Sequence, residues 1–228
     1  MKILYLETSS KNCSVAISDD EKLLCLCEEV SENYKQSESL HTYVEWALEG
    51  AGITMNDIEA VSLGKGPGSY TGLRIGAASA KGFCYGLKVP LIAVNSLETM
   101  IEPFLGKNYD YVVPLIDARR MEVYTAVYDG VTGEELSPTE AKILDETSFQ
   151  EFKDKKMIFV GDGAKKAKDI LDLPDAEFKD DAYPSSQFLI KKTIEKISRE
   201  EFEDIAYFEP FYLKDFHGVK KKNSSDSD

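Results

Sequence analysis

A glycine-rich segment between two expected regular elements is the part of this sequence best suited to bind a ligand. Gly66 and Gly68 precede Ser69, and an apolar stretch with helical spacing follows. Glycines let backbone N–H groups converge at a helix start, which suits a phosphate or carboxylate, so these three residues are candidate anion-binding or nucleotide-binding residues. The segment matches neither a Walker A loop nor a dinucleotide fingerprint. A tight strand-to-helix turn capped by Ser69 or Thr71 explains the same residues equally well.

The histidines and cysteines that could bind a transition metal are few and dispersed. His41 and His217 are the only histidines, the first in an expected helix and the second near the C-terminus. Cys25 and Cys27 lie two residues apart on an expected strand, so their side chains share one face. Without histidines beside them, we interpret them as reduced thiols of the core. The sequence therefore predicts no metal site.

The elements around the glycine-rich segment follow a recognisable order. Three short apolar runs separated by polar turns predict an antiparallel meander, and alternating helices and strands follow it. This order is typical of a ribonuclease-H-like α/β layer. The expected strands are 2–6, 13–17, 23–27, 58–63 and 89–94, and the expected helices are 37–51 and 71–85.

The second half of the chain begins like the first. Strands are expected at 111–116 and 122–128, and placing residue n beside residue n+110 sets Glu7 against Asp117 at the same distance from a matching second strand. This spacing indicates a weak internal duplication, with two unrelated hairpins as the alternative. Further along, a strand is expected at 157–160 and a helix at 185–198.

Composition limits the class of protein. The 228 residues are 43% hydrophobic and 30% charged, which suits one large domain or two small ones. A formal net charge of −14 excludes the broad basic surface of a stand-alone nucleic-acid binder. We expect no signal peptide, no membrane contact and a cytoplasmic location. The polar tail 218–228 is expected to be disordered.

Four motifs, in order along nearly the whole chain, resemble those of the TsaB family. This family is the dimerisation subunit of the bacterial machinery that makes N6-threonylcarbamoyladenosine in tRNA. Residues 66–76 resemble its GPGS-[FY]-TGLRIG signature, and residues 117–124 resemble its DARRxEVY element. Residues 3–9 resemble its first strand and DTS-type turn, and residues 209–214 its closing P-x-Y-L-[RK]. The GPGS and DARR elements are the specific ones.

The resemblance implies a fold and a set of partners. The fold is α/β of the ASKHA (actin, sugar kinase, Hsp70) type, with two ribonuclease-H-like halves, which we place at 1–103 and 104–217. The implied partners are the catalytic paralogue TsaD and the ATPase TsaE, with a homodimer possible without TsaD. ATP and a metal ion are expected in the partner subunits, with no cofactor in the isolated chain, and tRNA is expected to be reached only through the complex.

TsaD is known for two histidines, four residues apart, that hold its metal. Ser96 and Met100 occupy the matching places here, and neither is a credible ligand. Glu7 stands where ASKHA phosphotransferases keep an aspartate that positions Mg²⁺ through water. Because of this position we count Glu7 with the nucleotide-binding candidates, although its longer side chain displaces the carboxylate from the place that Mg²⁺ geometry requires. Hydrogen bonds from Glu7 to the following turn are the alternative.

Asp117 and Arg119 form the last polar pair of interest. They suit a polar cluster across a cleft between the two domains, although an acid and a base in a turn more often pair locally. No residue is assigned a catalytic role.

The helix that follows the glycine-rich segment predicts a partner surface. Its small residues recur at a spacing of three to four, and the resemblance implies that this helix and the preceding one form a four-helix bundle with TsaD. Close packing against the chain's own sheet is the alternative. Under the first interpretation, Gly76→Leu removes TsaD binding from a folded monomer. The predicted interface residues are Tyr43, Ala47, Leu48, Gly72, Gly76, Ser79 and Ala80.

Two functions from different classes follow. The first is a non-catalytic subunit that organises TsaD for threonylcarbamoyl transfer to adenosine 37 of tRNAs reading ANN codons. The second is an enzyme, either an ASKHA-type ATP-dependent phosphotransferase or a TsaD-like metallopeptidase. A peptidase needs a metal or an activated nucleophile beside a base, and the sequence has neither the histidine spacing nor a Gly-x-Ser-x-Gly turn.

Overall fold

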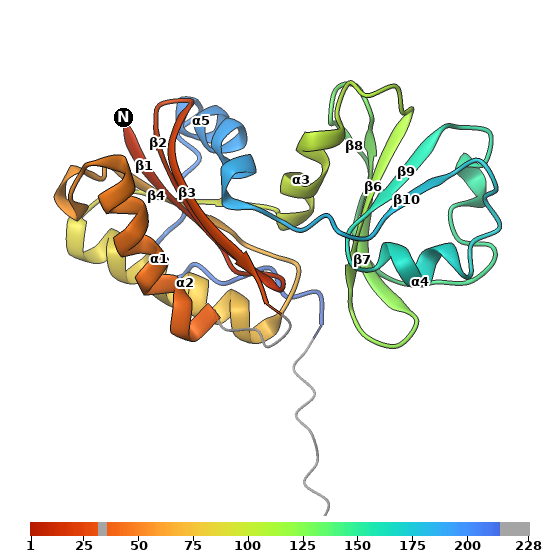
Figure 1. Ribbon diagram of the computed structural model, residues 1–228, viewed down its shortest axis with the longest axis horizontal. Helices are drawn as coiled ribbons and strands as arrows, with labels where there is room; N and C mark the ends of the chain where they lie inside the picture. Colours follow the sequence, from red (N-terminus) through yellow and green to blue (C-terminus); the bar gives the residue numbers. More distant parts are fainter. Residues whose placement is uncertain (32–35, 215–228) are drawn as a thin grey trace, which may run out of the picture.

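The protein consists of two α/β domains that lie side by side, each built around a five-stranded sheet (Figure 1). The structure is a computed structural model and describes residues 1–31 and 36–214. The N-terminal sheet has the order β3 (Lys22–Val30), β2 (Asn12–Asp19), β1 (Lys2–Glu7), β4 (Ala60–Gly64), β5 (Leu91–Val94). The C-terminal sheet has the order β8 (Glu135–Ile143), β7 (Glu122–Asp129), β6 (Tyr111–Asp117), β9 (Met157–Val160), β10 (Glu177–Lys179).

The two sheets share one topology. In each, the first three strands of the chain pair antiparallel, and the fourth and fifth continue the sheet in parallel. β2 and β7 begin 110 residues apart, as the duplication predicts. The expected α/β fold of two ribonuclease-H-like halves, the ASKHA arrangement, is therefore confirmed.

The N-terminal sheet is covered on both faces. Side chains alternate along β1, so Leu4 and Leu6 pack with α1 (Gln36–Ala51) and α2 (Tyr70–Leu87), whereas Ile3 and Tyr5 face the opposite side. That side is covered by the short 3-10 helix η4 (Ser186–Leu189) and by α5 (Ile190–Ser198), as Figure 1 shows. Because both faces are buried, all five residues of β4 are buried.

The C-terminal sheet is covered more thinly. α3 (Ser96–Ile101) packs on one face and α4 (Ala164–Lys168) on the other. These helices have six and five residues, too few for a helical pattern in the sequence, and β8 is an edge strand that tolerates Pro138. The sequence analysis missed all three elements. The remaining short turns are the 3-10 helices η1 (Met55–Asp57), η2 (Glu102–Phe104) and η3 (Gln150–Phe152).

The C-terminal domain is predicted to span residues 104–217, but in the structure it ends earlier in the chain. The chain returns to the N-terminal domain after β10: Ser62 Oγ and Thr193 Oγ1 are 2.7 Å apart, and the Glu203 N–H donates to the Leu91 carbonyl at 2.8 Å. Phe208 is buried in the N-terminal core. The physical reason is that the second face of the N-terminal sheet is apolar and α5 is the element that covers it.

Two further expectations concern location and the tail. Among the described helices, none has the length and apolar character needed to cross a membrane. The predicted disordered tail, 218–228, lies outside the described residues, as does His217.

Candidate functional site

A cleft of about 720 Å³ lies between the domains, next to the carboxyl ends of β1 and β6. The N-terminal domain contributes the turn after β1, residues 9–11, and the glycine-rich loop, residues 67–71. The C-terminal domain contributes the β6–β7 turn, Tyr124 and Asp162. Residues 211–214 complete the lining. Two of the four sequence motifs, the glycine-rich and DARR elements, thus face each other across this cleft.

The glycine-rich loop makes its hydrogen bonds within the protein. The Ser69 N–H donates to the Ser9 carbonyl at 2.6 Å, and the Gly66 N–H donates to Ser96 Oγ at 3.1 Å. Ser69 Oγ accepts the Gly72 N–H at 3.3 Å and caps α2. A Cβ at Gly68 would lie 2.2 Å from the Ser9 carbonyl oxygen. The loop is therefore a tight strand-to-helix turn held against β1, and two of the amides assigned to an anion already have partners.

Glu7 is enclosed in the N-terminal domain and does not line the cleft. Its carboxylate accepts the Ser9 N–H at 2.8 Å and the Ser96 hydroxyl at 3.0 Å. A Cβ at Gly64 would lie 1.9 Å from Glu7 Oε2, so only glycine fits beside it. Burial raises the pKa of Glu7 above its ordinary value, although these hydrogen bonds oppose the shift.

The described position of Glu7 does not support its assignment as a nucleotide-binding residue, which stays a prediction. A carboxylate with no exposed surface cannot hold Mg²⁺ through water at the cleft. The alternative interpretation, a hydrogen bond to the turn after β1, describes the observed contact.

Ser96 and Met100, at the places of the TsaD histidine pair, belong to the core. Ser96 is fully buried and joins Glu7 to the amide of Gly66. Met100 is 1% exposed and packs with Val112 and other apolar side chains. In residues 1–31 and 36–214, no three His, Cys, Asp or Glu side chains are grouped to hold a metal ion. The donor set therefore does not fit a TsaD-type metal site.

The β6–β7 turn is held by a lysine. Lys166 Nζ donates to Asp117 Oδ1 at 2.6 Å and to the carbonyls of Arg120 and Glu122 at 3.1 and 2.5 Å. Asp117 Oδ1 also accepts the Arg119 N–H at 2.7 Å. The ion pair of Asp117 is therefore with Lys166 of α4 and not with the Arg119 side chain, so the expected local pair of acid and base does not form, and both Asp117 and Arg119 line the cleft.

Asp162 is a cleft residue that the sequence analysis missed. It follows Gly161 at the end of β9 and accepts the Asp117 N–H at 2.8 Å. Burial, and to a smaller extent the nearby Asp117 charge, raises its pKa. The Gly-Asp-Gly sequence after an expected strand was the available signal.

The last described segment links the two domains across the cleft. The Phe211 N–H donates to the Lys65 carbonyl at 2.7 Å, and the Tyr212 ring lies 5.1 Å from the Tyr70 ring. Lys214 forms an ion pair with Glu122 at the start of β7. The closing motif therefore helps to set the relative position of the domains.

Five of the seven predicted interface residues of α1 and α2 are buried in the N-terminal domain. A Cβ at Gly72 would lie 2.0 Å from the Thr8 carbonyl oxygen, and one at Gly76 would lie 2.4 Å from Thr8 Oγ1. Ser79 and Leu48 are half-buried. The close approach of α2 to the turn after β1 explains why Gly72 and Gly76 are small, which favours the alternative interpretation of packing within the chain. Tyr43, Ala47, Gly72, Gly76 and Ala80 are all buried.

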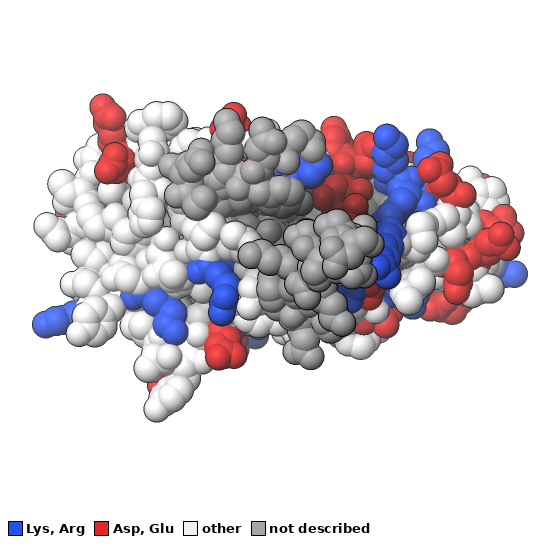
Figure 2. Space-filling model, turned by 90° about the horizontal axis from the view of Figure 1, so that it is seen from below, with Lys and Arg blue, Asp and Glu red and all other residues white. Residues whose placement is uncertain are grey.

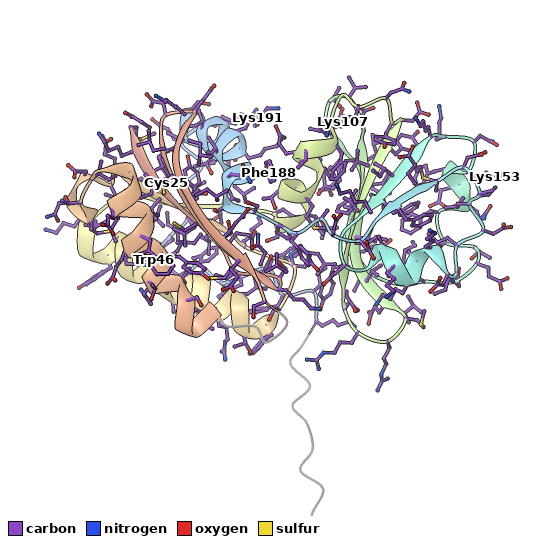
Figure 3. The ribbon with its side chains drawn as sticks, in the orientation of Figure 1. Cys25, Trp46, Lys107, Lys153, Phe188 and Lys191 are labelled. Carbon is purple, nitrogen blue, oxygen red and sulfur yellow. The ribbon has the colours of Figure 1, made fainter. Side chains whose placement is uncertain are left out.

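Other residues of the same helices face outward. Trp46 of α1 is 55% exposed, and Tyr85 of α2 is 82% exposed. Figure 3 labels Trp46 on α1. Gly82 and Gly86 are exposed, and a Cβ at either would meet no atom within 4 Å among the described residues. We call these four residues the α1–α2 surface.

Comparisons with known proteins agree with the motifs. The family model "TsaD: tRNA N6-adenosine threonylcarbamoyltransferase" matches residues 28–215. The tRNA threonylcarbamoyladenosine biosynthesis protein TsaB of Bacillus subtilis is 32% identical over 167 residues, which cover 71% of each chain. TsaB of Escherichia coli is 37% identical over 129 residues, 56% of this chain, so the match spans about half (55%) of that relative.

A solved structure has the same fold. YeaZ from Pseudomonas aeruginosa superimposes with a TM-score of 0.77 at 24% identity, over 93% of this chain and 99% of that one. With the duplicated sheets, the four motifs and the identity to curated TsaB proteins, this match leads to one assignment. The chain belongs to the TsaB family and carries the domain that the TsaD family model describes.

Proposed function

We propose that the chain is a non-catalytic subunit that binds TsaD, and through it TsaE, in the complex that modifies adenosine 37 of tRNAs reading ANN codons. The reaction transfers a threonylcarbamoyl group to N6 of that adenosine. ATP and a metal ion bind to the partner subunits, and the complex works in the cytoplasm. The names of the curated relatives support a role in this pathway.

The proposal rests on one observation, which is that Ser96 and Glu7 are both buried in the core. These residues stand where related proteins keep a metal ligand and a Mg²⁺-positioning acid, and here they hydrogen-bond to each other without exposed surface. An enzyme of either alternative class needs such groups at the cleft. A subunit that supports a catalytic partner needs only the scaffold.

The α1–α2 surface is the proposed contact with TsaD. Trp46 and Tyr85 supply large exposed apolar groups of the kind that anchor protein interfaces. Gly82 and Gly86 let a partner helix approach the α2 backbone closely. Without TsaD, the same surface suits pairing with a second copy of this chain.

A modification assay tests the function. We expect no threonylcarbamoyladenosine from the chain alone with threonylcarbamoyl-adenylate and tRNA, and a strong increase when the chain is added to TsaD, TsaE and ATP. Modification by the chain alone contradicts the proposal. Turnover of ATP by the purified chain would favour the phosphotransferase alternative instead.

A single substitution tests the surface. Gly82→Leu adds a bulky side chain where a partner helix is expected, and leucine favours the helix more than glycine does. We therefore expect at least a tenfold loss of TsaD affinity in calorimetry, with a melting temperature that does not fall. Lys191→Leu on α5, which Figure 3 shows on another side of the domain, is the control and leaves affinity unchanged. Normal binding by the Gly82 variant places the interface elsewhere.

A further inference from the structure

Two consecutive arginines in the β6–β7 turn have an unfavourable backbone conformation. Arg119 and Arg120 have φ values of +71° and +52°. Residues with a Cβ rarely adopt positive φ, whereas glycine does so without steric cost. Two glycines would fit this turn better, so the arginine side chains need a reason other than stability of the fold.

The charges of both arginines are available at the surface. Both residues are exposed, and within residues 1–31 and 36–214 neither guanidinium donates a hydrogen bond or forms an ion pair. The acids beside them are already paired: Asp117 with Lys166, and Glu122 with Lys214. Among the described residues, no carboxylate forms an ion pair with either arginine, although Asp162 lines the same cleft as Arg119.

The surroundings of the turn add further cations. Lys166 holds the turn rigidly, and the neighbouring Lys165 of α4 is exposed. Lys11 lines the same cleft as Arg119. Figure 2, which views the lower face, shows lysine and arginine atoms in a band across the molecule on the side of the C-terminal domain. In a chain of net charge −14, such a cluster is a local exception.

We propose that Arg119 and Arg120 contact phosphates of the tRNA backbone in the assembled complex. This inference rests on the proposed function, because tRNA is the substrate there. Guanidinium groups bind phosphate oxygens in pairs, and contacts of this kind position an RNA without reading its sequence. The acidic remainder of the chain opposes long-range attraction, so the free chain binds RNA weakly and the contact contributes within the complex.

The test replaces both arginines in the full chain. Arg119→Gly with Arg120→Gly removes two charges and supplies the residue that the backbone prefers. In fluorescence anisotropy with labelled tRNA and the complex of this chain with TsaD, we expect about tenfold weaker binding. The slope of log affinity against log salt falls by roughly one to two. The melting temperature of the free chain stays the same or rises.

Two controls separate this contact from other causes. Lys153→Gln with Lys155→Gln removes the same charge at the far end of the C-terminal domain, where Figure 3 shows Lys153, and leaves tRNA affinity unchanged. Arg119→Lys with Arg120→Lys keeps the charge and retains part of the affinity. Equal losses in the Lys153 and Lys155 control would indicate a net-charge effect and overturn the proposal.

Other outcomes are equally clear. If the glycine variant binds tRNA as tightly as the wild type does, the proposed contact is wrong. If the melting temperature of this variant is also lowered, the arginines have a structural role. If an acidic peptide binds to the wild-type chain at this turn but tRNA does not bind to the complex, the surface binds protein and the proposal is wrong. Size-exclusion chromatography of the chain with TsaD, without RNA, tests the proposed function separately.

Discussion

One methyl group at Gly72 is expected to destabilise the N-terminal domain, whereas the same methyl at Gly82 of the same helix is expected to stabilise it. A Cβ at Gly72 would lie 2.0 Å from the Thr8 carbonyl oxygen, a backbone atom in the turn after β1. Overpacking of this kind costs about 1–3 kcal/mol or more. At Gly82 a Cβ meets no described atom within 4 Å, and alanine gains about 0.8–1 kcal/mol in a helix.

Urea unfolding of Gly72→Ala and Gly82→Ala, followed by circular dichroism, measures the contrast. We expect the two variants to differ by roughly 2–4 kcal/mol in the free energy of unfolding. Equal stabilities would show that Gly72 does not contact Thr8 as described. Gly76→Leu is expected to destabilise the domain for the same reason as Gly72→Ala, because its Cβ would lie 2.4 Å from Thr8 Oγ1. We therefore expect this variant to lose its fold, rather than to lose TsaD binding selectively.

Glu7→Gln is expected to change how stability depends on pH. The pKa of Glu7 in the folded protein is raised above 4.5 by burial, so the folded state holds the proton more firmly than the unfolded state. The stability contributed by this group is complete below the unfolded pKa and is lost as pH rises through the folded pKa. Glutamine has a similar shape and does not titrate, so the variant lacks this loss.

The quantity to measure is the difference in the free energy of unfolding between the wild type and Glu7→Gln. From about pH 4.5 upward, the variant gains stability relative to the wild type by up to about 1.4 kcal/mol per pH unit, until the folded pKa is passed. Any hydrogen bond that glutamine makes less well with Ser9 or Ser96 adds an offset that does not depend on pH. Urea unfolding at a series of pH values from 4 to 8 measures the slope, and parallel profiles would contradict a raised pKa.

The sequence by itself determined the topology and the motifs. Alternation along residues 2–6 and 13–17 identified strands, and the n+110 match of Glu7 with Asp117 indicated a repeated half, because side-chain periodicity and strand order are local properties of the chain. The GPGS and DARR elements identified the family on the same local basis. Short elements such as α3 and α4 carry too little pattern and were missed.

Only the tertiary structure decided which way the residues face. On α2, Gly72 and Gly76 and, separately, Gly82 and Gly86 have the same four-residue spacing, so the sequence cannot tell which pair packs inward. The close approach of Thr8 to the first pair settles the choice. Two other features were also decided only by the tertiary structure. They are the contact of the buried Glu7 with Ser96 and the packing of α5 on the N-terminal sheet. Each depends on residues far apart in the chain that meet only after folding.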